Sequence, residues 1–143
     1  MTGRRLPQFL LAAALAATCA SGTAWADKIL EMKAQLTSQQ EVPPLESRAG
    51  GTAKFEVTPD GYVVGTVQTF GINGVAAYIA QGAADVNGRV VVPLKQKNDH
   101  EWVTPEGAAL TAKQIDAFKI GDLYVNVDTD AHPSGQVRGV LHE

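Results

Sequence analysis

The residues best suited to chemistry in this sequence of 143 residues lie close together near its C-terminal end. Asp128, Asp130 and His132 fall in the stretch LYVNVDTDAHPSGQVRG, residues 123–139. Two carboxylates followed by an imidazole could bind a divalent metal ion, because hard cations prefer oxygen ligands and transition metals prefer nitrogen. The stretch lacks the Ca²⁺-loop pattern, however, and is poor in nitrogen and sulfur for zinc or copper. The alternative is a polar turn, in which Asp128 ends a strand, Asp130 caps the turn and His132 leads into the last strand.

A second candidate is a pair of opposite charges from the two ends of the chain. Glu41 lies in the stretch QEVPP, and Arg138 lies in the stretch QVRG. A bidentate contact between them would tie the first loop to the last strand. The alternative is that both are solvated surface charges, which contribute little to stability.

Nucleophilic catalysis has little support in the sequence. The single cysteine, Cys19, lies in the N-terminal segment, and the serines Ser38, Ser47 and Ser134 are not part of a G-x-S-x-G turn. We therefore expect a protein that is not an enzyme.

The elements that must position these residues are mainly short alternating segments. Residues 30–36 alternate apolar and polar side chains, as a half-buried strand does. Residues 53–70 read as a hairpin around the turn TPDG, and residues 123–128 and 135–141 read as the last two strands. Strands at this spacing, separated by turns rich in glycine and proline, predict an all-β sandwich or barrel.

One segment departs from the strand pattern. Thr111 and Gln114 have the spacing of a capping box, and Gly121 stands where a helix would end. The pattern predicts one short helix near residues 112–119.

The N-terminal segment resembles a secretory signal peptide. Arg4 and Arg5 precede an apolar run, and the small-residue site AWA ends at Ala26. We expect cleavage after Ala26, which leaves residues 27–143 as a single exported domain, periplasmic or extracellular, with no membrane span.

Removal of residues 1–26 would change the charge of the chain. The net charge falls from −3 to −5, because 10 basic side chains then face the 15 acidic ones. An acidic chain without a basic cluster argues against binding to nucleic acid.

Several motifs in this order resemble the CHRD domain, a module named after chordin and also found singly in secreted bacterial proteins. They are QQEVPPLESRAGGTAKF, GINGVAAYIAQGAADVNGRVVVPL, LTAKQIDAFKIGDLYVNV and HPSGQVRG, spread over about residues 30–142. The resemblance implies a Greek-key β-sandwich or barrel, immunoglobulin-like or superoxide-dismutase-like. It implies no established enzymatic activity.

The chain departs from the family pattern at three positions. Bacterial members often carry histidines where this chain has Tyr78, Ala80 and Asp128. Two histidines one residue apart, with a third from a neighbouring strand, could bind a transition metal. Without these imidazoles, we expect no such metal chemistry at the same place.

These observations lead to a ranked set of functions. We expect an exported, non-catalytic CHRD-domain protein that acts as a binding or structural module, with an envelope or extracellular protein or glycan as its partner. The alternative is a metal-binding protein with a divalent ion near Asp128, Asp130 and His132. A degenerate superoxide-dismutase-like enzyme ranks last. No cofactor is expected apart from that divalent metal.

Overall fold

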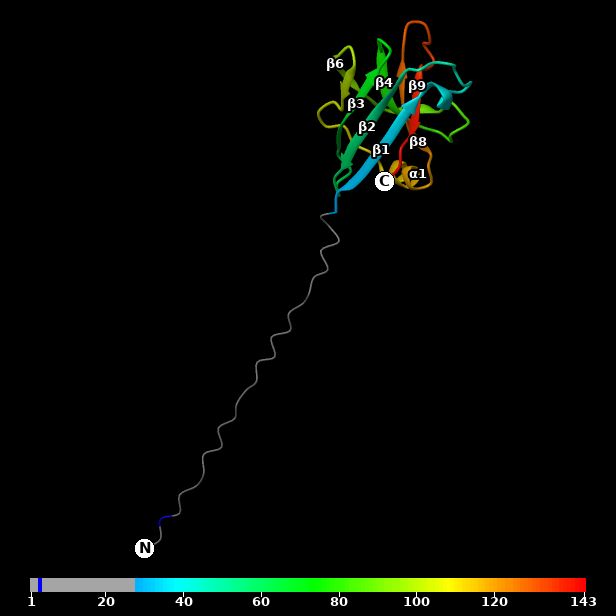
Figure 1. Ribbon diagram of the computed structural model, residues 1–143. Helices are drawn as coiled ribbons and strands as arrows, with labels where there is room; N and C mark the ends of the chain where they lie inside the picture. Colours follow the sequence, from blue (N-terminus) through cyan, green and yellow to red (C-terminus); the bar gives the residue numbers. More distant parts are fainter. Residues whose placement is uncertain (1–2, 4–27) are drawn as a thin grey trace.

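The computed structural model describes residues 3 and 28–143, and these contain nine antiparallel strands in one sheet with a single α-helix (Figure 1). The strands are β1 (Leu30–Thr37), β2 (Gly50–Val57), β3 (Val63–Phe70), β4 (Ala76–Gln81), β5 (Arg89–Pro93), β6 (Lys95–Asn98), β7 (Glu101–Val103), β8 (Leu123–Asp128) and β9 (Val137–Val140). A 3-10 turn, η1 (Ser38–Gln40), follows β1, and the helix is α1 (Ala112–Lys119). The all-β prediction is confirmed. The predicted signal peptide lies outside the described residues, apart from Gly3.

The sheet curls into a nearly closed barrel. Its strand order is β5-β4-β8-β9-β1-β2-β3-β7-β6, so β1 lies between the last strand and the second. The two end strands are consecutive in the chain and meet at Leu94, whose N–H donates to the carbonyl of Ala77 at 2.9 Å. The side chain of Gln96 donates to the carbonyl of Gly74 at 3.2 Å. These contacts bring β6 against the β4 side of the sheet.

Alternating apolar side chains fill the inside of the barrel. On β1, Met32, Ala34 and Leu36 are buried, while Glu31 and Lys33 face solvent. The hairpin of β2 and β3 adds Phe55 and other apolar residues in the same way. The core also contains Val57, Val63, Val67, Ala77, Ile79, Val92, Trp102, Leu123, Val125, Val127, Val137 and Leu141.

Helix α1 packs near one end of the barrel, beside the C-terminus (Figure 1). Its capping box is present: the Gln114 N–H donates to Thr111 Oγ1, and the Thr111 N–H donates to Gln114 Oε1 at 2.8 Å. Ala117 and Phe118 are buried against the core. Gly121 follows the helix with φ of 82°, a conformation that favours glycine. In residues 3 and 28–143, no helix has the length and apolar character needed to cross a membrane.

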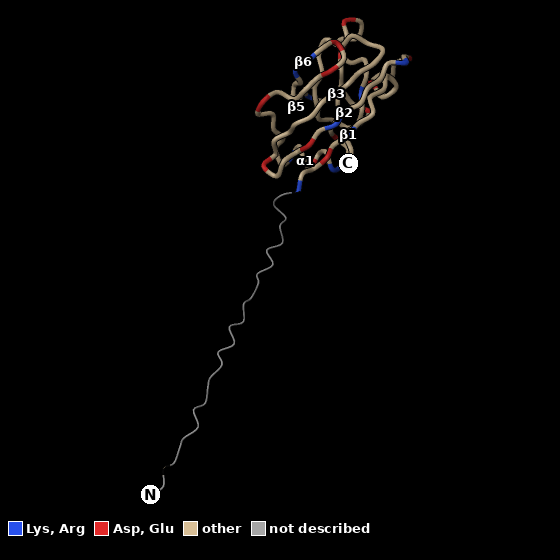
Figure 2. Tube along the Cα trace, turned by 60° about the vertical axis from the view of Figure 1, so that its left-hand side comes forward, with Lys and Arg blue, Asp and Glu red and all other residues tan. Residues whose placement is uncertain are grey.

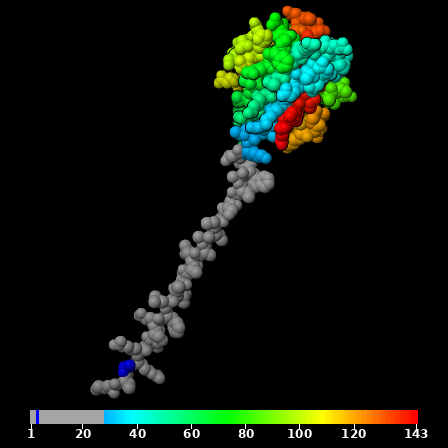
Figure 3. All heavy atoms as spheres, viewed as in Figure 1, coloured from blue at the N-terminus to red at the C-terminus, as the bar shows by residue number. Residues whose placement is uncertain are grey.

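Strands β4, β8 and β9 are buried on both faces. All of β8 except its last residue is inaccessible, because its outer face lies beneath two connecting segments, residues 38–49 and 82–88. Figure 3 shows these segments, coloured cyan and bright green, on the same side of the molecule. The outer face of these three strands therefore forms a second buried layer, and the candidate site lies there.

Candidate functional site

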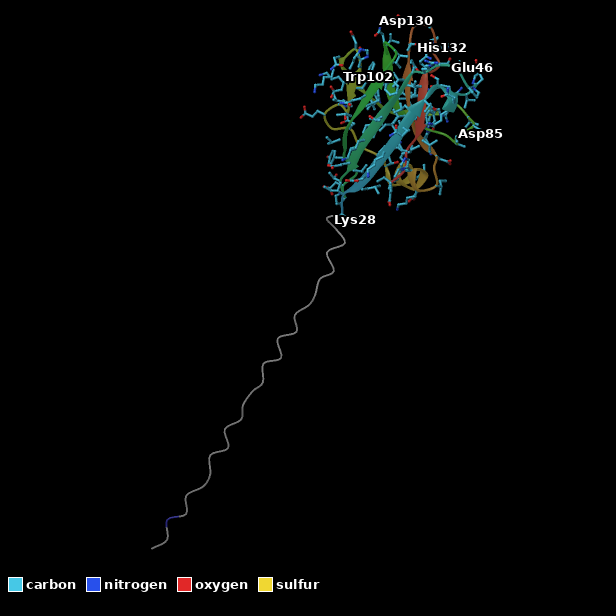
Figure 4. The ribbon with its side chains drawn as sticks, viewed as in Figure 1. Lys28, Glu46, Asp85, Trp102, Asp130 and His132 are labelled. Atoms are coloured by element: carbon cyan, nitrogen blue, oxygen red, sulfur yellow. The ribbon has the colours of Figure 1, made fainter. Side chains whose placement is uncertain are left out.

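The stretch that suggested a metal site forms a turn. The His132 N–H donates to the Thr129 carbonyl at 3.1 Å, and the Gly135 N–H donates to the His132 carbonyl at 3.1 Å. Asp130 is exposed at the outer end of the loop (Figure 4). The Asp128 carboxylate is half-buried and accepts a hydrogen bond from Tyr78. In the described part of the chain, no group of three or more histidine, cysteine or acidic residues is placed to hold a metal ion.

Among the described residues, Asp128, Asp130 and His132 are not brought together as a group that could hold a metal ion. In the turn, Asp130 faces solvent and the backbone of His132 is fixed by hydrogen bonds to Thr129. The Asp128 carboxylate accepts a hydrogen bond from the Tyr78 hydroxyl instead. As the polar-turn interpretation expects, Asp128 ends β8, but the side chain that bonds within the turn is Thr129, whose Oγ1 accepts from the His132 N–H at 3.2 Å.

Glu41 and Arg138 are not surface charges. Charged residues occur all along the trace of the described domain (Figure 2), but Glu41 is only 3% exposed and Arg138 is 0% exposed. The expected bidentate pair is not formed either, because the guanidinium N–H groups are used elsewhere. Within residues 28–143, the ion pairs are Lys33–Glu31, Lys97–Glu101 and Lys119–Asp116, all with at least one largely exposed side chain.

Arg138 instead holds the segment that follows β4. Its guanidinium carbon lies 3.5 Å from the centre of the Tyr124 ring, in cation–π contact. Nη2 donates to the carbonyls of Ala83 at 2.9 Å and Val86 at 2.8 Å, and Nη1 donates to Asn87 Oδ1 at 3.3 Å. One buried cation thus fixes the backbone of residues 82–88 on the outer face of the sheet.

Asn87 joins the two covering segments. Its Nδ2 donates to the carbonyl of Val42 at 2.9 Å, while its Oδ1 accepts from Arg138. The neighbouring Gly88 N–H donates to the Tyr124 hydroxyl at 2.8 Å. Residues 38–49 and 82–88 are therefore fixed to each other and to the sheet by a single hydrogen-bonded network.

Tyr78, Ala80 and Asp128, the three positions singled out by the resemblance, lie close together on this outer face. Tyr78 pairs with Asn126 across the strands, Ala80 pairs with Tyr124, and Asp128 is in the same row as Asn126. The Tyr78 hydroxyl donates to Asp128 Oδ1 at 3.2 Å and accepts from Asn126 Nδ2 at 3.2 Å. A tyrosine–carboxylate hydrogen bond thus connects two of the three substituted positions in this chain.

Burial changes the acidity of this pair. Burial, followed by the negative charge of Asp128 and its hydrogen bond, raises the pKa of Tyr78 above its ordinary value. Burial also raises the pKa of Asp128, and the hydrogen bond from Tyr78 offsets part of that shift. The phenol therefore stays protonated as the donor.

Glu41 lies beside this pair with an incompletely satisfied carboxyl group. Its Oε2 is so close to Gly135 that a side-chain carbon there would collide with it and with the Asn126 amide. Burial raises the pKa of Glu41 to about 7; the charge of Arg138 and a backbone hydrogen bond from Val42 act in the opposite direction, and the charge of Asp128 adds to the rise. Among the residues the structure describes, Glu41 Oε1, Asn126 Oδ1 and Arg138 Nε are buried without a hydrogen-bond partner.

Two clefts flank Glu41. One, of about 180 Å³, lies between the segment at 41–45 and the turn at 131–135. The other, of about 370 Å³, lies between residues 39–44 and residues 84–85, and Val140 also lines it. Glu41 and Val42 line both clefts, so the two clefts adjoin at this part of the connecting segment.

Sequence reasoning did not find Tyr124, Asn126 and Gly135 as members of this site. Their one available signal was that Tyr124 and Asn126 alternate with the apolar Leu123, Val125 and Val127, which places them on the opposite face of β8. The pattern of the strand does not show that this face is covered, because it does not locate the segments that cover it.

Comparison with known proteins identifies the domain. The model of the family described as CHRD domain matches residues 32–141. Searches of curated proteins and of solved structures found no match. The family match spans most of the chain, from within β1 to beyond the end of β9, so the chain belongs to the CHRD domain family.

Proposed function

We propose that this CHRD-domain protein is an exported, non-catalytic binding module that contacts a protein of the cell envelope or exterior through the two clefts beside Glu41. The observation that carries the proposal is that three connecting segments, residues 38–49, 82–88 and 130–135, meet at these clefts. Binding residues are commonly carried by loops that a rigid scaffold positions.

The fixation of these segments supports a binding role. Arg138 and Asn87 hold residues 82–88 and 38–49 in place through buried hydrogen bonds. A surface that is already ordered loses less conformational entropy when a partner binds. The clefts therefore have the preorganisation that recognition requires.

The use of the polar groups supports a non-catalytic role. The N–H groups of Arg138 bind backbone carbonyls, and the Tyr78 hydroxyl binds Asp128. General acid–base catalysis requires a group within hydrogen-bond reach of a substrate proton. These side chains are engaged with the protein itself, which suits a structural task better.

Export is supported by the basic, apolar and A-x-A segments of residues 1–26. The test is intact-mass spectrometry of the protein recovered from the periplasm or medium of the producing cells. A chain that begins at Asp27 is expected. Recovery only from the cytoplasm, with residues 1–26 retained, would contradict export.

Binding is tested by site-specific photo-crosslinking in the producing cells. A photoreactive residue at Val42 or Asp85, in the cleft walls, is expected to trap one discrete protein partner. The matched control is Val64 on β3, which is 65% exposed and belongs to neither cleft. The same crosslinked species from Val64, or none from either cleft position, would contradict the proposed binding face.

A further inference from the structure

Two asparagines of this chain are each followed by glycine, Asn73 by Gly74 and Asn87 by Gly88. In such a pair the backbone nitrogen of the glycine can attack the side-chain carbonyl carbon of the asparagine, because glycine has no Cβ to obstruct the approach. Both asparagines are exposed, so solvent reaches both. The structure nevertheless holds the two pairs in different ways.

The Asn87 pair is fixed by hydrogen bonds on both sides of the reacting atoms. Asn87 Nδ2 donates to the carbonyl of Val42 at 2.9 Å, and Asn87 Oδ1 accepts from Arg138 Nη1 at 3.3 Å. The Gly88 N–H, which contains the attacking nitrogen, donates to the Tyr124 hydroxyl at 2.8 Å. The side-chain amide and the attacking nitrogen are both engaged with other groups, so ring closure would require these hydrogen bonds to break.

The Asn73 pair lies in the connection between β3 and β4 and has no such contacts. In the described part of the chain, neither the Asn73 side chain nor the Gly74 N–H forms a hydrogen bond. The connection is held only after this peptide bond. There the Gly74 carbonyl accepts from Gln96 Nε2 at 3.2 Å, and the next N–H, that of Val75, donates to the Asp128 carbonyl at 2.8 Å. The Asn73 side chain is therefore free to turn toward the Gly74 nitrogen.

We propose that Asn73 deamidates spontaneously to isoaspartate in the folded protein, and that the hydrogen bonds around Asn87 protect it from the same reaction. The Gly74 nitrogen loses its proton and forms a bond to Asn73 Cγ; the bond from Cγ to the side-chain nitrogen breaks, and that nitrogen takes up a proton and leaves as ammonia. Water then opens the cyclic imide at either carbonyl, which gives aspartate or isoaspartate. The inference goes beyond the proposed function and does not depend on it.

The difference in rate follows from the geometry of the two pairs. Ring closure is an intramolecular step, and a misplacement of about 1 Å from the productive geometry can slow such a step about 100-fold. Asn87 must first give up its bonds to Val42 and Arg138, whereas Asn73 needs only a rotation of an exposed side chain. We therefore expect Asn73 to react at least about tenfold faster than Asn87.

Conversion of Asn73 to isoaspartate would disturb the closure of the barrel. The reaction adds a carbon to the main chain just before Gly74 and places a negative charge there. Gly74 is buried, and a Cβ on it would lie 2.8 Å from Val127 Cγ1 and 3.0 Å from the Trp102 ring, so its backbone has little room to shift. Its carbonyl also accepts the bond from Gln96 that helps to bring β6 against the β4 side of the sheet. The modification should therefore loosen this contact.

The test follows both sites in one sample. Protein expressed from the full sequence is held at mildly alkaline pH, and peptide-mapping mass spectrometry over time measures the replacement of NH2 by OH. Electron-transfer fragmentation distinguishes isoaspartate from aspartate. In the folded protein, the peptide that contains Asn73 should be converted at least about tenfold faster than the peptide that contains Asn87. Equal rates, or faster conversion of Asn87, would overturn the inference.

The same measurement in guanidinium separates the fold from the local sequence. Without the fold, Asn73 and Asn87 should be converted at similar rates, and Asn87 should react faster than it does in the folded protein. A rate difference as large as that of the folded protein would place its cause in the neighbouring sequence and would contradict protection by the outer face.

Variants provide matched controls. Asn73→Gln should abolish the product at that site, because the larger ring closes much more slowly, and should leave Asn87 unchanged. Arg138→Met removes the donor to Asn87 Oδ1 and should accelerate conversion of Asn87 without affecting Asn73. An unchanged rate at Asn87 in folded Arg138→Met would overturn the protective role. If this variant does not fold, the comparison of folded and denatured unaltered protein still decides the question.

The converted protein tests the structural consequence. Its added negative charge allows separation by ion exchange, and amide hydrogen exchange should then be faster at residues 71–77 and 94–96 than in the unconverted protein. The β1–β2 hairpin should exchange at the same rate in both. Equal exchange at residues 94–96 would contradict the expected effect on closure of the barrel.

Discussion

The inner and outer faces of β8 are both buried, but they carry opposite kinds of side chain. The inner face presents Leu123, Val125 and Val127, which pack into the apolar core. The outer face presents Tyr124 and Asn126, which pack against Arg138 and the covering segments. The inner face is stabilised by the burial of apolar surface, and the outer face is stabilised by hydrogen bonds to a few backbone groups. The two faces should therefore respond differently to substitution.

The largest effect is expected inside the barrel. Phe55 is 0% exposed, so Phe55→Ala should lower the free energy of unfolding by about 3–5 kcal/mol through lost burial and the remaining cavity. Urea unfolding measures the change, and hydrogen exchange should accelerate across all strands. A loss confined to one or two strands would show that the inner face does not act as one cooperative unit.

Substitution of Arg138 should affect the outer face selectively. Arg138→Met keeps much of the length of the side chain but leaves the carbonyls of Ala83 and Val86 without their donor, at a cost of about 3 kcal/mol. Amide exchange should accelerate most in residues 82–88 and 38–49. Uniform acceleration, as in Phe55→Ala, would remove the distinction between the two faces.

The outer face should also make stability depend on pH. The pKa of Glu41 is raised to about 7 in the folded state, so its stabilising contribution is fully present below the unfolded value of 4.5 and is lost as the pH rises through 7. The free energy of unfolding should fall by about 3 kcal/mol between pH 4.5 and pH 8 from this group. Asp128, whose pKa is also raised, adds a change of the same sign.

Glu41→Gln isolates that contribution. Urea unfolding at several pH values should give a flatter profile for Glu41→Gln than for the unaltered protein, with Glu46→Gln as the control. Parallel profiles in all three proteins would mean that Glu41 titrates in the folded state much as it does in the unfolded state.

The smallest effect is expected for the tyrosine–carboxylate contact. Tyr78→Phe removes two part-buried hydrogen bonds, the one that the hydroxyl donates to Asp128 and the one that it accepts from Asn126, at a cost of about 2 kcal/mol. Because the first of these bonds lowers the pKa of Asp128, its loss should raise the pKa further, as NMR titration of the carboxyl carbon can measure. An unchanged Asp128 pKa would show that Tyr78 contributes only packing.

The same contrast explains what the sequence could predict. The alternation of apolar and polar side chains shows which side of a strand faces the apolar core. The buried residues of β1 and of the β2–β3 hairpin could therefore be predicted from the sequence. The capping box of Thr111 and Gln114 is a local pattern, and it predicted α1 correctly.

No local sequence pattern predicted the second buried layer on the outer face of β4, β8 and β9. Arg138 donates to the backbone carbonyls of residues 83 and 86. Every residue has such a carbonyl, so the identities of the side chains do not show which residues Arg138 contacts. Glu41 and Arg138 were paired because their charges are opposite, yet the structure buries both and joins Arg138 to another segment. The turn at 129–135 looked like a ligand set because spacing along the chain does not show which way Asp128 and Asp130 point.

The two end strands of the sheet, β5 and β6, are joined at Leu94, and their short length affects how copies of this protein can associate. The two strands that end the sheet have only 5 and 4 residues, and they include Pro93 and the charged Arg89, Lys95 and Lys97. Long, flat, apolar edges are the places where sheets recruit further strands, and short edges with proline and lysine discourage it. The short end strands β5 and β6, which bring the two ends of the sheet together, therefore also limit edge-to-edge aggregation.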